Sequence, residues 1–166
     1  MSKYTDEDIK PVRWEEHAIE RPEMYFGQEG PSAKKITDAL KEAATILGAK
    51  QTDIQEICGW TIFFADIDWV FNSETKLESV ESVFISLRPF PEAGEINSYR
   101  YEALTTPFSS DVFTIYKKKI DVIKGNTPNR DILRKMNSSL SGRAVGFKYA
   151  YIAYKQFKNG RLTTAL

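Results

Sequence analysis

RPEMYFG, at residues 21–27, separates a short helical turn from the most regular helix pattern in the chain. Pro22 and Gly27 interrupt regular structure, and the three residues Met24 to Phe26 between them form a compact apolar plug. Packing of this plug under a sheet would explain the segment without any ligand. A structural role is therefore expected for its Arg21, Pro22, Met24, Tyr25 and Gly27.

The residues after this segment predict a long helix over 33–47. Ser32 is a good N-cap, apolar residues recur at helical spacing from Ile36 to Leu47, and charged residues fill the opposite face. Gly48 fits the end of the helix. Before the segment, residues 1–12 are expected to form a flexible arm, and residues 14–19 one or two helical turns.

Strand patterns dominate the rest of the chain. Apolar runs and alternation predict strands at 57–64, 69–71, 80–87, 99–104, 112–116 and 120–123, and a second helix over 131–136. There is no internal repeat and no linker long enough to separate two domains. The chain is therefore predicted to be a single α+β domain over residues 1–166. Its sheet should be mixed or mainly antiparallel, with the 33–47 helix packed on one face.

Composition limits the class of protein. The 166 residues are 42% hydrophobic, which is enough for one globular domain with a real core. No apolar run is long enough to cross a membrane. The polar, acidic N-terminus does not resemble a signal peptide, and the single cysteine, Cys58, excludes an internal disulfide framework. Together these features predict a cytoplasmic protein.

The formal net charge of zero hides an uneven distribution. Residues 50–111 carry 11 acidic and 4 basic side chains, whereas residues 112–166 carry 2 acidic and 12 basic ones. The two stretches either neutralise one another on folding or present charged surfaces that steer partners. If the acidic stretch meets a partner, its candidate contacts are Asp66, Asp68, Glu74, Glu78 and Glu81.

The basic stretch also contains many aromatic residues. Basic and aromatic side chains together bind single-stranded nucleic acid through phosphate contacts and base stacking, although a strand with one packed face gives the same pattern. The aromatic residues concerned are Phe113, Tyr116, Phe147, Tyr149, Tyr151, Tyr154 and Phe157.

Residues 8–48 resemble the start of the gyrase B and topoisomerase IV B subunits, members of the GHKL ATPases, which carry R-P-x-M-Y-x-G before a long helix. The resemblance implies a nucleotide site in which that helix supplies a glutamate base and, four residues later, an asparagine that holds magnesium. Asp38 could stand in for the glutamate, although a solvated helix face is the alternative. Lys41 or Glu42 replaces the asparagine, and a lysine there would repel magnesium.

Two further elements of the family also depart from its pattern. The nearest match to D-x-G-x-G is residues 66–70, which have the acids but no glycine. The match to the phosphate-binding glycine loop is residues 138–147, for which a small-residue turn is the alternative. The candidate cofactor-binding residues are thus Asp38, Gly142, Arg143 and Gly146. No catalytic residue, bound cofactor or metal is expected.

Small stand-alone proteins with R-P-x-M-Y-x-G but without the rest of the ATPase look like immunity proteins of bacterial toxin systems, including contact-dependent inhibition. This resemblance implies a non-catalytic module that covers a toxin. An acidic surface would suit a basic nuclease toxin. Two alternatives remain open: a gyrase-B-like nucleotide-binding protein, and a nucleic-acid-binding protein that uses the basic C-terminal third.

Overall fold

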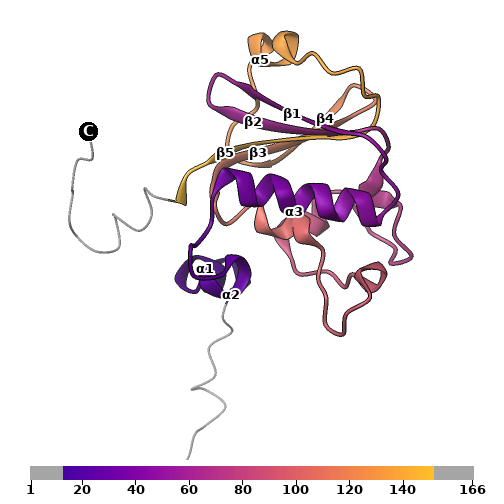
Figure 1. The fold of residues 1–166 in the computed structure, drawn as a ribbon. Helices are drawn as coiled ribbons and strands as arrows, with labels where there is room; N and C mark the ends of the chain where they lie inside the picture. Colours follow the sequence, from indigo (N-terminus) through magenta and orange to yellow (C-terminus); the bar gives the residue numbers. More distant parts are fainter. Residues whose placement is uncertain (1–12, 152–166) are drawn as a thin grey trace, which may run out of the picture.

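The computed structural model describes residues 13–151 (Figure 1). They form one α+β domain around a five-stranded antiparallel sheet with strand order β1-β2-β5-β3-β4. The strands are β1 (Thr52–Ile57), β2 (Trp60–Ala65), β3 (Ser109–Tyr116), β4 (Lys119–Lys124) and β5 (Ala144–Tyr149). The expected arm at residues 1–12, together with Tyr154 and Phe157, lies outside the described residues.

Helices lie on both faces of the sheet, as Figure 1 shows for α3 and α5. The α-helices are α1 (Trp14–Glu20), α2 (Glu23–Phe26), α3 (Ala33–Ile46), α4 (Ser82–Ile85) and α5 (Arg130–Lys135). Single turns of 3₁₀ helix are η2 (Trp69–Phe71), η3 (Pro91–Ala93) and η4 (Tyr101–Leu104). None of the helices within residues 13–151 has the length and apolar character that a bilayer span requires.

The long helix α3 is confirmed close to its predicted bounds. The Ser32 hydroxyl accepts a hydrogen bond from the Lys35 backbone N–H at 3.1 Å, which satisfies a donor in the first turn. Its buried face includes Ile36, Leu40 and Ala43, which lie in one apolar cluster with Phe63 of β2. The helical spacing of apolar residues therefore predicted both the helix and the face that it turns to the sheet.

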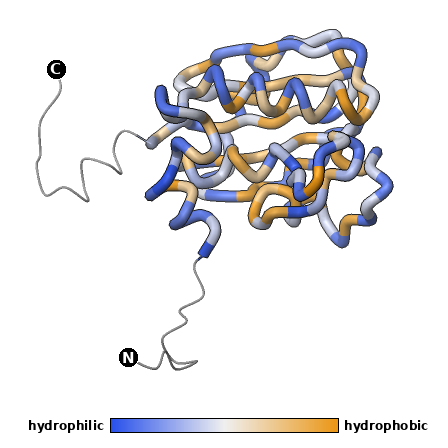
Figure 2. The backbone as a smooth tube through the Cα atoms, turned by 60° about the horizontal axis from the view of Figure 1, so that its bottom comes forward, coloured by the Kyte–Doolittle hydropathy of each residue, from blue (hydrophilic) through white to orange (hydrophobic). Residues whose placement is uncertain are grey.

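Strand β2 is buried along its whole length because the sheet is covered on both faces. Phe63 and Ala65 belong to the core on the α3 side. Trp60, Ile62 and Phe64 belong to a second core that includes Ile132 of α5. The tube in Figure 2 is accordingly orange along parts of the inner strands and alternates in colour along the helices.

The predicted strand 57–64 is confirmed only from Trp60 onward, where it is β2. Ile57 is the last residue of β1, and β1 and β2 pair antiparallel across a turn at Cys58 and Gly59. Both turn residues have positive φ angles, 49° and 83°, which a continuous strand does not allow. The polar residues of β1 gave no alternating pattern to reveal the first strand.

The segment 80–87 contains the helical turn α4 and no strand. Alternation would place Val83, Ile85 and Leu87 on one buried face, but Ile85 is 45% and Leu87 41% exposed. The adjacent residues Val83 and Phe84 are both buried instead, which a helical turn permits and a one-sided strand does not.

The short strands predicted at 69–71 and 99–104 are also wrong, because these segments form η2 and η4. Strands β3 and β4 and helix α5 are confirmed at the predicted places. The region between β2 and β3 therefore contains short helical turns and loops, and only an isolated bridge between Pro89 and Tyr99 is strand-like.

Candidate functional site

A hollow of about 560 Å³ opens where β3 turns into β4. Segments far apart in the sequence form its walls: the residues around η2, the segment 78–81, strand β4 and the residue before β5. We call it the acidic hollow, and the side chains that define it are Asp68, Phe71, Glu78, Glu81, Asp121, Val122 and Arg143.

An ion pair between Arg143 and Asp68 lines the inner wall of the acidic hollow. The Arg143 Nε and Nη2 atoms donate to the two carboxylate oxygens of Asp68 at 2.7 and 2.8 Å, a bidentate geometry. Nη1 donates to the Thr114 hydroxyl at 3.1 Å. The guanidinium carbon lies 5.6 Å from the Phe71 ring centre and 5.2 Å from that of Tyr116. Arg143 is therefore engaged within the protein and is not a free anion-binding side chain.

The lining of the acidic hollow combines carboxylates with apolar surface. Glu78 and Glu81 are exposed. Asp121 forms an ion pair with Lys119, with 3.3 Å between Asp121 Oδ1 and Lys119 Nζ. Phe71 and Val122 are 48% and 40% exposed, large fractions for apolar side chains. An apolar centre with a charged rim is the usual composition of a protein–protein contact patch.

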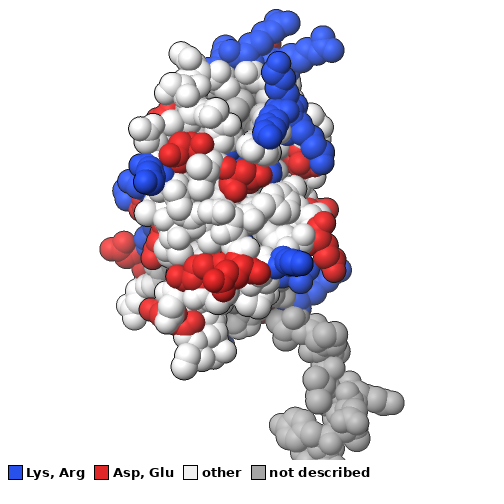
Figure 3. Space-filling model, turned by 90° about the vertical axis from the view of Figure 1, so that its right-hand side faces the viewer, with Lys and Arg blue, Asp and Glu red and all other residues white. Residues whose placement is uncertain are grey.

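Charged side chains are unevenly spread over the molecule. Figure 3 faces the right-hand side of Figure 1, and on it the largest group of Lys and Arg side chains lies at the top. Acidic patches lie beside that group and farther down on the same face. Arg143 and Asp68 do join the basic and acidic stretches, but carboxylates of the acidic stretch such as Glu78 and Glu81 stay exposed.

The structure brings three of the five predicted partner contacts together. Asp68, Glu78 and Glu81 line the acidic hollow, although Asp68 is bound to Arg143 and is no exposed carboxylate. Asp66 lies elsewhere and accepts the backbone N–H of Lys50 at 3.1 Å. Glu74 is exposed outside the lining.

The sequence did not indicate three other residues of the hollow, Phe71, Asp121 and Val122. Asp121 and Val122 belong to an edge strand, and only the strand order places that edge beside residues 78–81. No local pattern carries such information.

The candidate cofactor-binding residues do not converge. Asp38 is 54% exposed and pairs with Lys34 at 2.7 Å on the solvent face of α3. The loop that contains Gly142 leads into strand β5, so it lacks the helix N-terminus that binds phosphates in the GHKL family. Of the two alternatives for this loop, its lead into β5 favours the small-residue turn over a phosphate-binding loop.

Packing explains both glycines of that loop. A Cβ at Gly142 would overlap the backbone of Ala65 and Ile67, and one at Gly146 would overlap the ring of Phe113. Glycine is thus required there by close approach of protein to protein. Within residues 13–151, no group of three or more His, Cys, Asp or Glu side chains is placed to hold a metal ion.

The RPEMYFG segment consists of α2, the two residues that link α1 to it, and Gly27 at its end. Pro22 is buried, and the Phe26 ring packs edge-on against Phe108 with centres 5.2 Å apart. Met24 is 66% exposed, so its expected place in the apolar plug is wrong. Arg21 is exposed at the end of α1, and Gly27 adopts a positive φ of 75° after α2.

Tyr25 connects this segment to two other parts of the chain. Its hydroxyl lies 3.0 Å from His17 Nδ1, and its ring meets those of Trp14 and Tyr99 edge-on at 6.4 and 6.1 Å. Burial raises the pKa of the Tyr25 hydroxyl. The side chain therefore holds α1, α2 and the residues before η4 together.

We expect Tyr25→Ala to lower the free energy of unfolding by about 2 kcal/mol, because it removes a half-buried ring and three ring contacts. Tyr25→Phe, which removes only the hydroxyl, should cost about 1 kcal/mol or less. Urea denaturation of both variants measures the difference. An unchanged midpoint for Tyr25→Ala would show that the segment does not stabilise the fold.

Most described aromatic residues of the basic stretch are part of the core. Phe113, Phe147 and Tyr151 are buried, and the Tyr149 hydroxyl donates to the Pro31 carbonyl at 2.8 Å. Lys148 lies over the Trp60 ring at 4.9 Å. The buried rings cannot stack on bases, so the pattern reflects a packed strand and its neighbours.

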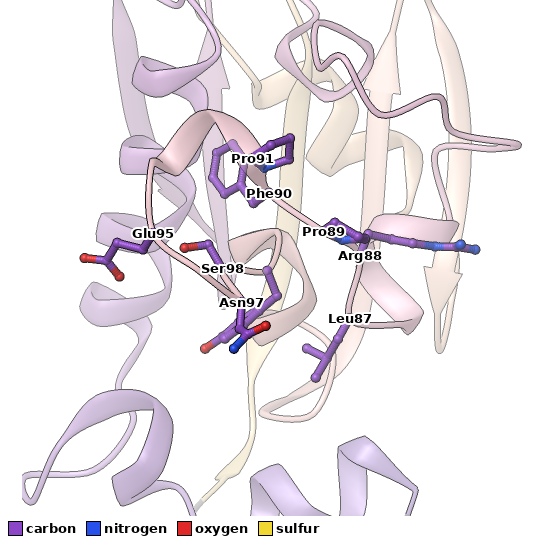
Figure 4. Close-up of a pocket in the computed structure, with 9 residues that line it drawn as sticks. Leu87, Arg88, Pro89, Phe90, Pro91, Glu95, Asn97 and Ser98 are labelled. Carbon is purple, nitrogen blue, oxygen red and sulfur yellow. The ribbon is translucent and has the colours of Figure 1, made fainter.

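A second hollow, of about 520 Å³, lies among residues 87–99 (Figure 4). In Figure 4, Arg88 and Glu95 point to opposite sides, away from one another, and Phe90 and Pro91 lie together at one edge. Its charged groups therefore do not converge on a common point, as they would in a specific polar site.

Of residues 8–48, for which the sequence led us to expect a GHKL-like segment, residues 8–12 lie outside the described part of the chain. No protein-family model, curated protein or solved structure matches this chain.

Proposed function

We propose that this chain is a non-catalytic protein-binding module, an immunity protein that neutralises a cognate toxin by direct binding in the bacterial cytoplasm. The proposed partner is a basic protein, such as a nuclease toxin of a contact-dependent inhibition system. The acidic hollow is the proposed contact site. The observation that carries the proposal is the apolar surface of Phe71 and Val122 beside the exposed carboxylates Glu78 and Glu81.

The acidic hollow can contribute both to the affinity and to the association rate of a basic partner. Exposed apolar side chains at the centre of a patch contribute most of the binding free energy, because they lose water on contact. Carboxylates at the rim contribute mainly to the association rate of a basic partner and to its choice over other proteins. The acidic hollow has both, and its inner ion pair between Arg143 and Asp68 keeps the lining in place.

The double variant Glu78→Lys/Glu81→Lys is expected to slow association with a basic toxin encoded beside this chain's gene about tenfold or more at low salt. The effect should shrink as the salt concentration rises, because salt screens exposed charges. Surface plasmon resonance at two salt concentrations measures both quantities, and a growth assay with the toxin measures protection.

The matched control is Glu56→Lys/Glu74→Lys, which changes the net charge equally at exposed positions outside the acidic hollow. An equal loss in both double variants would mean that only the overall charge matters. Changing Lys117, Lys118 and Lys119 to Glu tests the basic surface. Loss of binding in that variant alone would place the interface there and contradict the proposal.

The proposal also expects no magnesium-dependent ATP binding. Asp38 is held by Lys34, and Glu42 or Lys41 occupies the place of the family's asparagine. Calorimetry with a non-hydrolysable ATP analogue and magnesium should show no saturable heat. Micromolar affinity that disappears in Asp38→Ala would support the nucleotide-binding alternative instead.

A further inference from the structure

A third hollow, of about 310 Å³, lies between α2, α3 and η4. Its walls are mainly aromatic and apolar, supplied by Tyr25, Phe26, Tyr99, Tyr101 and Leu104. We call it the aromatic hollow. None of its residues lines the acidic hollow, so the two are separate places on the protein.

Three tyrosine rings meet in the aromatic hollow, Tyr25 from α2, Tyr101 from the start of η4 and Tyr99 from just before it. The centres of Tyr25 and Tyr99 lie 6.1 Å apart at an interplanar angle of 74°, and those of Tyr99 and Tyr101 lie 6.2 Å apart at 85°. Successive rings are therefore nearly perpendicular, in edge-to-face contact with one another, and all three line the hollow. Ring faces are electron-rich and attract cations within about 6 Å.

The charges around the aromatic hollow leave one acidic group free. Lys35 donates to the carbonyls of Phe26 and Gly30 at 3.1 and 2.8 Å, so its ammonium is held by the loop after α2. Asp38 is neutralised by Lys34. Glu42 is exposed and makes no side-chain hydrogen bond or ion pair to any residue in 13–151.

The tyrosine hydroxyls stay neutral at ordinary pH, so the rings offer a cation no phenolate charge and Glu42 is the group that would pair with it. Burial, followed by the neighbouring Tyr25 and Tyr101, raises the pKa of Tyr99 to about 12. Burial also raises the pKa of Tyr101, and the nearby carboxylates of Glu42 and Glu95 raise it further. A cation in this space would therefore meet the tyrosine rings and the Glu42 carboxylate, while the Lys35 ammonium in the lining is held by the carbonyls of Phe26 and Gly30.

We propose that the aromatic hollow binds an arginine side chain of a protein partner, with the guanidinium against the tyrosine rings and paired with Glu42. A planar guanidinium stacks on aromatic faces and forms directed hydrogen bonds to a carboxylate. The hollow is open and has room for such a side chain. The proposal is independent of the acidic hollow, because the two share no residue.

Two capped peptides form the test, acetyl-Gly-Arg-Gly-amide and the same peptide with citrulline, the neutral isostere of arginine. Chemical-shift changes in ¹⁵N–¹H spectra give the affinity and the location. The arginine peptide should shift the amides of Tyr25, Glu42, Tyr99 and Tyr101. The affinity for the citrulline peptide should be lower than that for the arginine peptide by a factor of about five or more.

Glu42→Gln should weaken the arginine peptide about threefold or more, because it removes one exposed charge without altering the fold. Tyr101→Leu should weaken it at least as much, and its thermal melting curve checks that the domain is intact. Glu81→Gln, in the acidic hollow, is the matched control and should leave the affinity unchanged.

Three results would overturn the proposal: no shifts at any peptide concentration, equal affinity for arginine and citrulline, or shifts located away from the aromatic hollow. Unchanged affinity in Glu42→Gln would also contradict the assigned pairing. The peptide experiment does not depend on whether the acidic-hollow variants lose toxin binding. A failure of the arginine-binding proposal can therefore be told apart from a failure of the proposed function.

Discussion

Glu102→Ala is expected to lower the free energy of unfolding by about 3–5 kcal/mol, because it leaves a buried guanidinium without its counter-charge. Both partners of the pair are inaccessible to solvent, with side-chain exposures of 1% for Arg100 and 0% for Glu102. Arg100 Nη2 and Nε donate to the carboxylate at 2.6 and 3.2 Å. The Trp69 indole N–H donates to it as well, at 2.8 Å.

This network holds the region between β2 and β3, which has no regular strands. Arg100 Nη1 donates to the Val70 carbonyl at 3.2 Å, and the guanidinium lies 5.4 Å from the Phe90 ring centre. The side chains of residues 100 and 102 thus connect η2, the start of η3 and η4. Loss of the carboxylate should loosen all three turns together.

Urea denaturation followed by tryptophan fluorescence measures the effect, and Trp69 lies in the network itself. The control is the double variant Arg100→Met/Glu102→Leu, which removes both charges and keeps the volume. Replacement of a buried pair by apolar residues is often nearly neutral, so this variant should regain part of the lost stability, less the cost of leaving the buried Trp69 indole N–H without its acceptor. If Glu102→Ala costs less than about 1 kcal/mol, the pair is not what orders this region.

Local patterns predicted the elements whose stability is local. α3 has an N-cap, helical spacing and a stop signal within one stretch, and the β3–β4 hairpin combines apolar alternation with a turn. The strand predictions around Trp69 and Tyr101 are wrong because contacts with residues distant in the sequence determine the conformation of these segments. No pattern near Trp69 indicates Glu102, which accepts its indole N–H.

The candidate sites show the same division. Glu78 and Glu81 were recognisable as acidic surface residues because charge is visible in the sequence. Their apolar neighbours in space, Phe71 and Val122, come from η2 and an edge strand that meet only in the folded domain. Tyr99 and Tyr101 were assigned to a strand, so the aromatic hollow was not expected either.

Asp68→Ala is expected to destabilise the domain by about 3 kcal/mol, more than Arg143→Met, for which about 1–2 kcal/mol is expected. The difference follows from burial, since the Arg143 side chain is 4% exposed and that of Asp68 15%. Removal of the carboxylate strands a buried guanidinium that only Thr114 then satisfies. Removal of the guanidinium leaves a carboxylate that water reaches more easily, and methionine keeps an apolar stem between Phe71 and Tyr116.

Urea denaturation of the two single variants and of Asp68→Ala/Arg143→Met gives the coupling energy between the side chains. A coupling near zero, or a larger loss for Arg143→Met, would contradict the inferred ion pair and revive an anion-binding role for Arg143. The same burial explains why a Lys at position 68 is a poor probe of the surface. The lysine would place a second cation beside Arg143 and disrupt the local structure of the acidic hollow. A loss of toxin binding in that variant would then reflect the structural change and not the loss of a surface contact. Substitution of the exposed Glu78 and Glu81 changes the charge of the acidic hollow without breaking a buried ion pair.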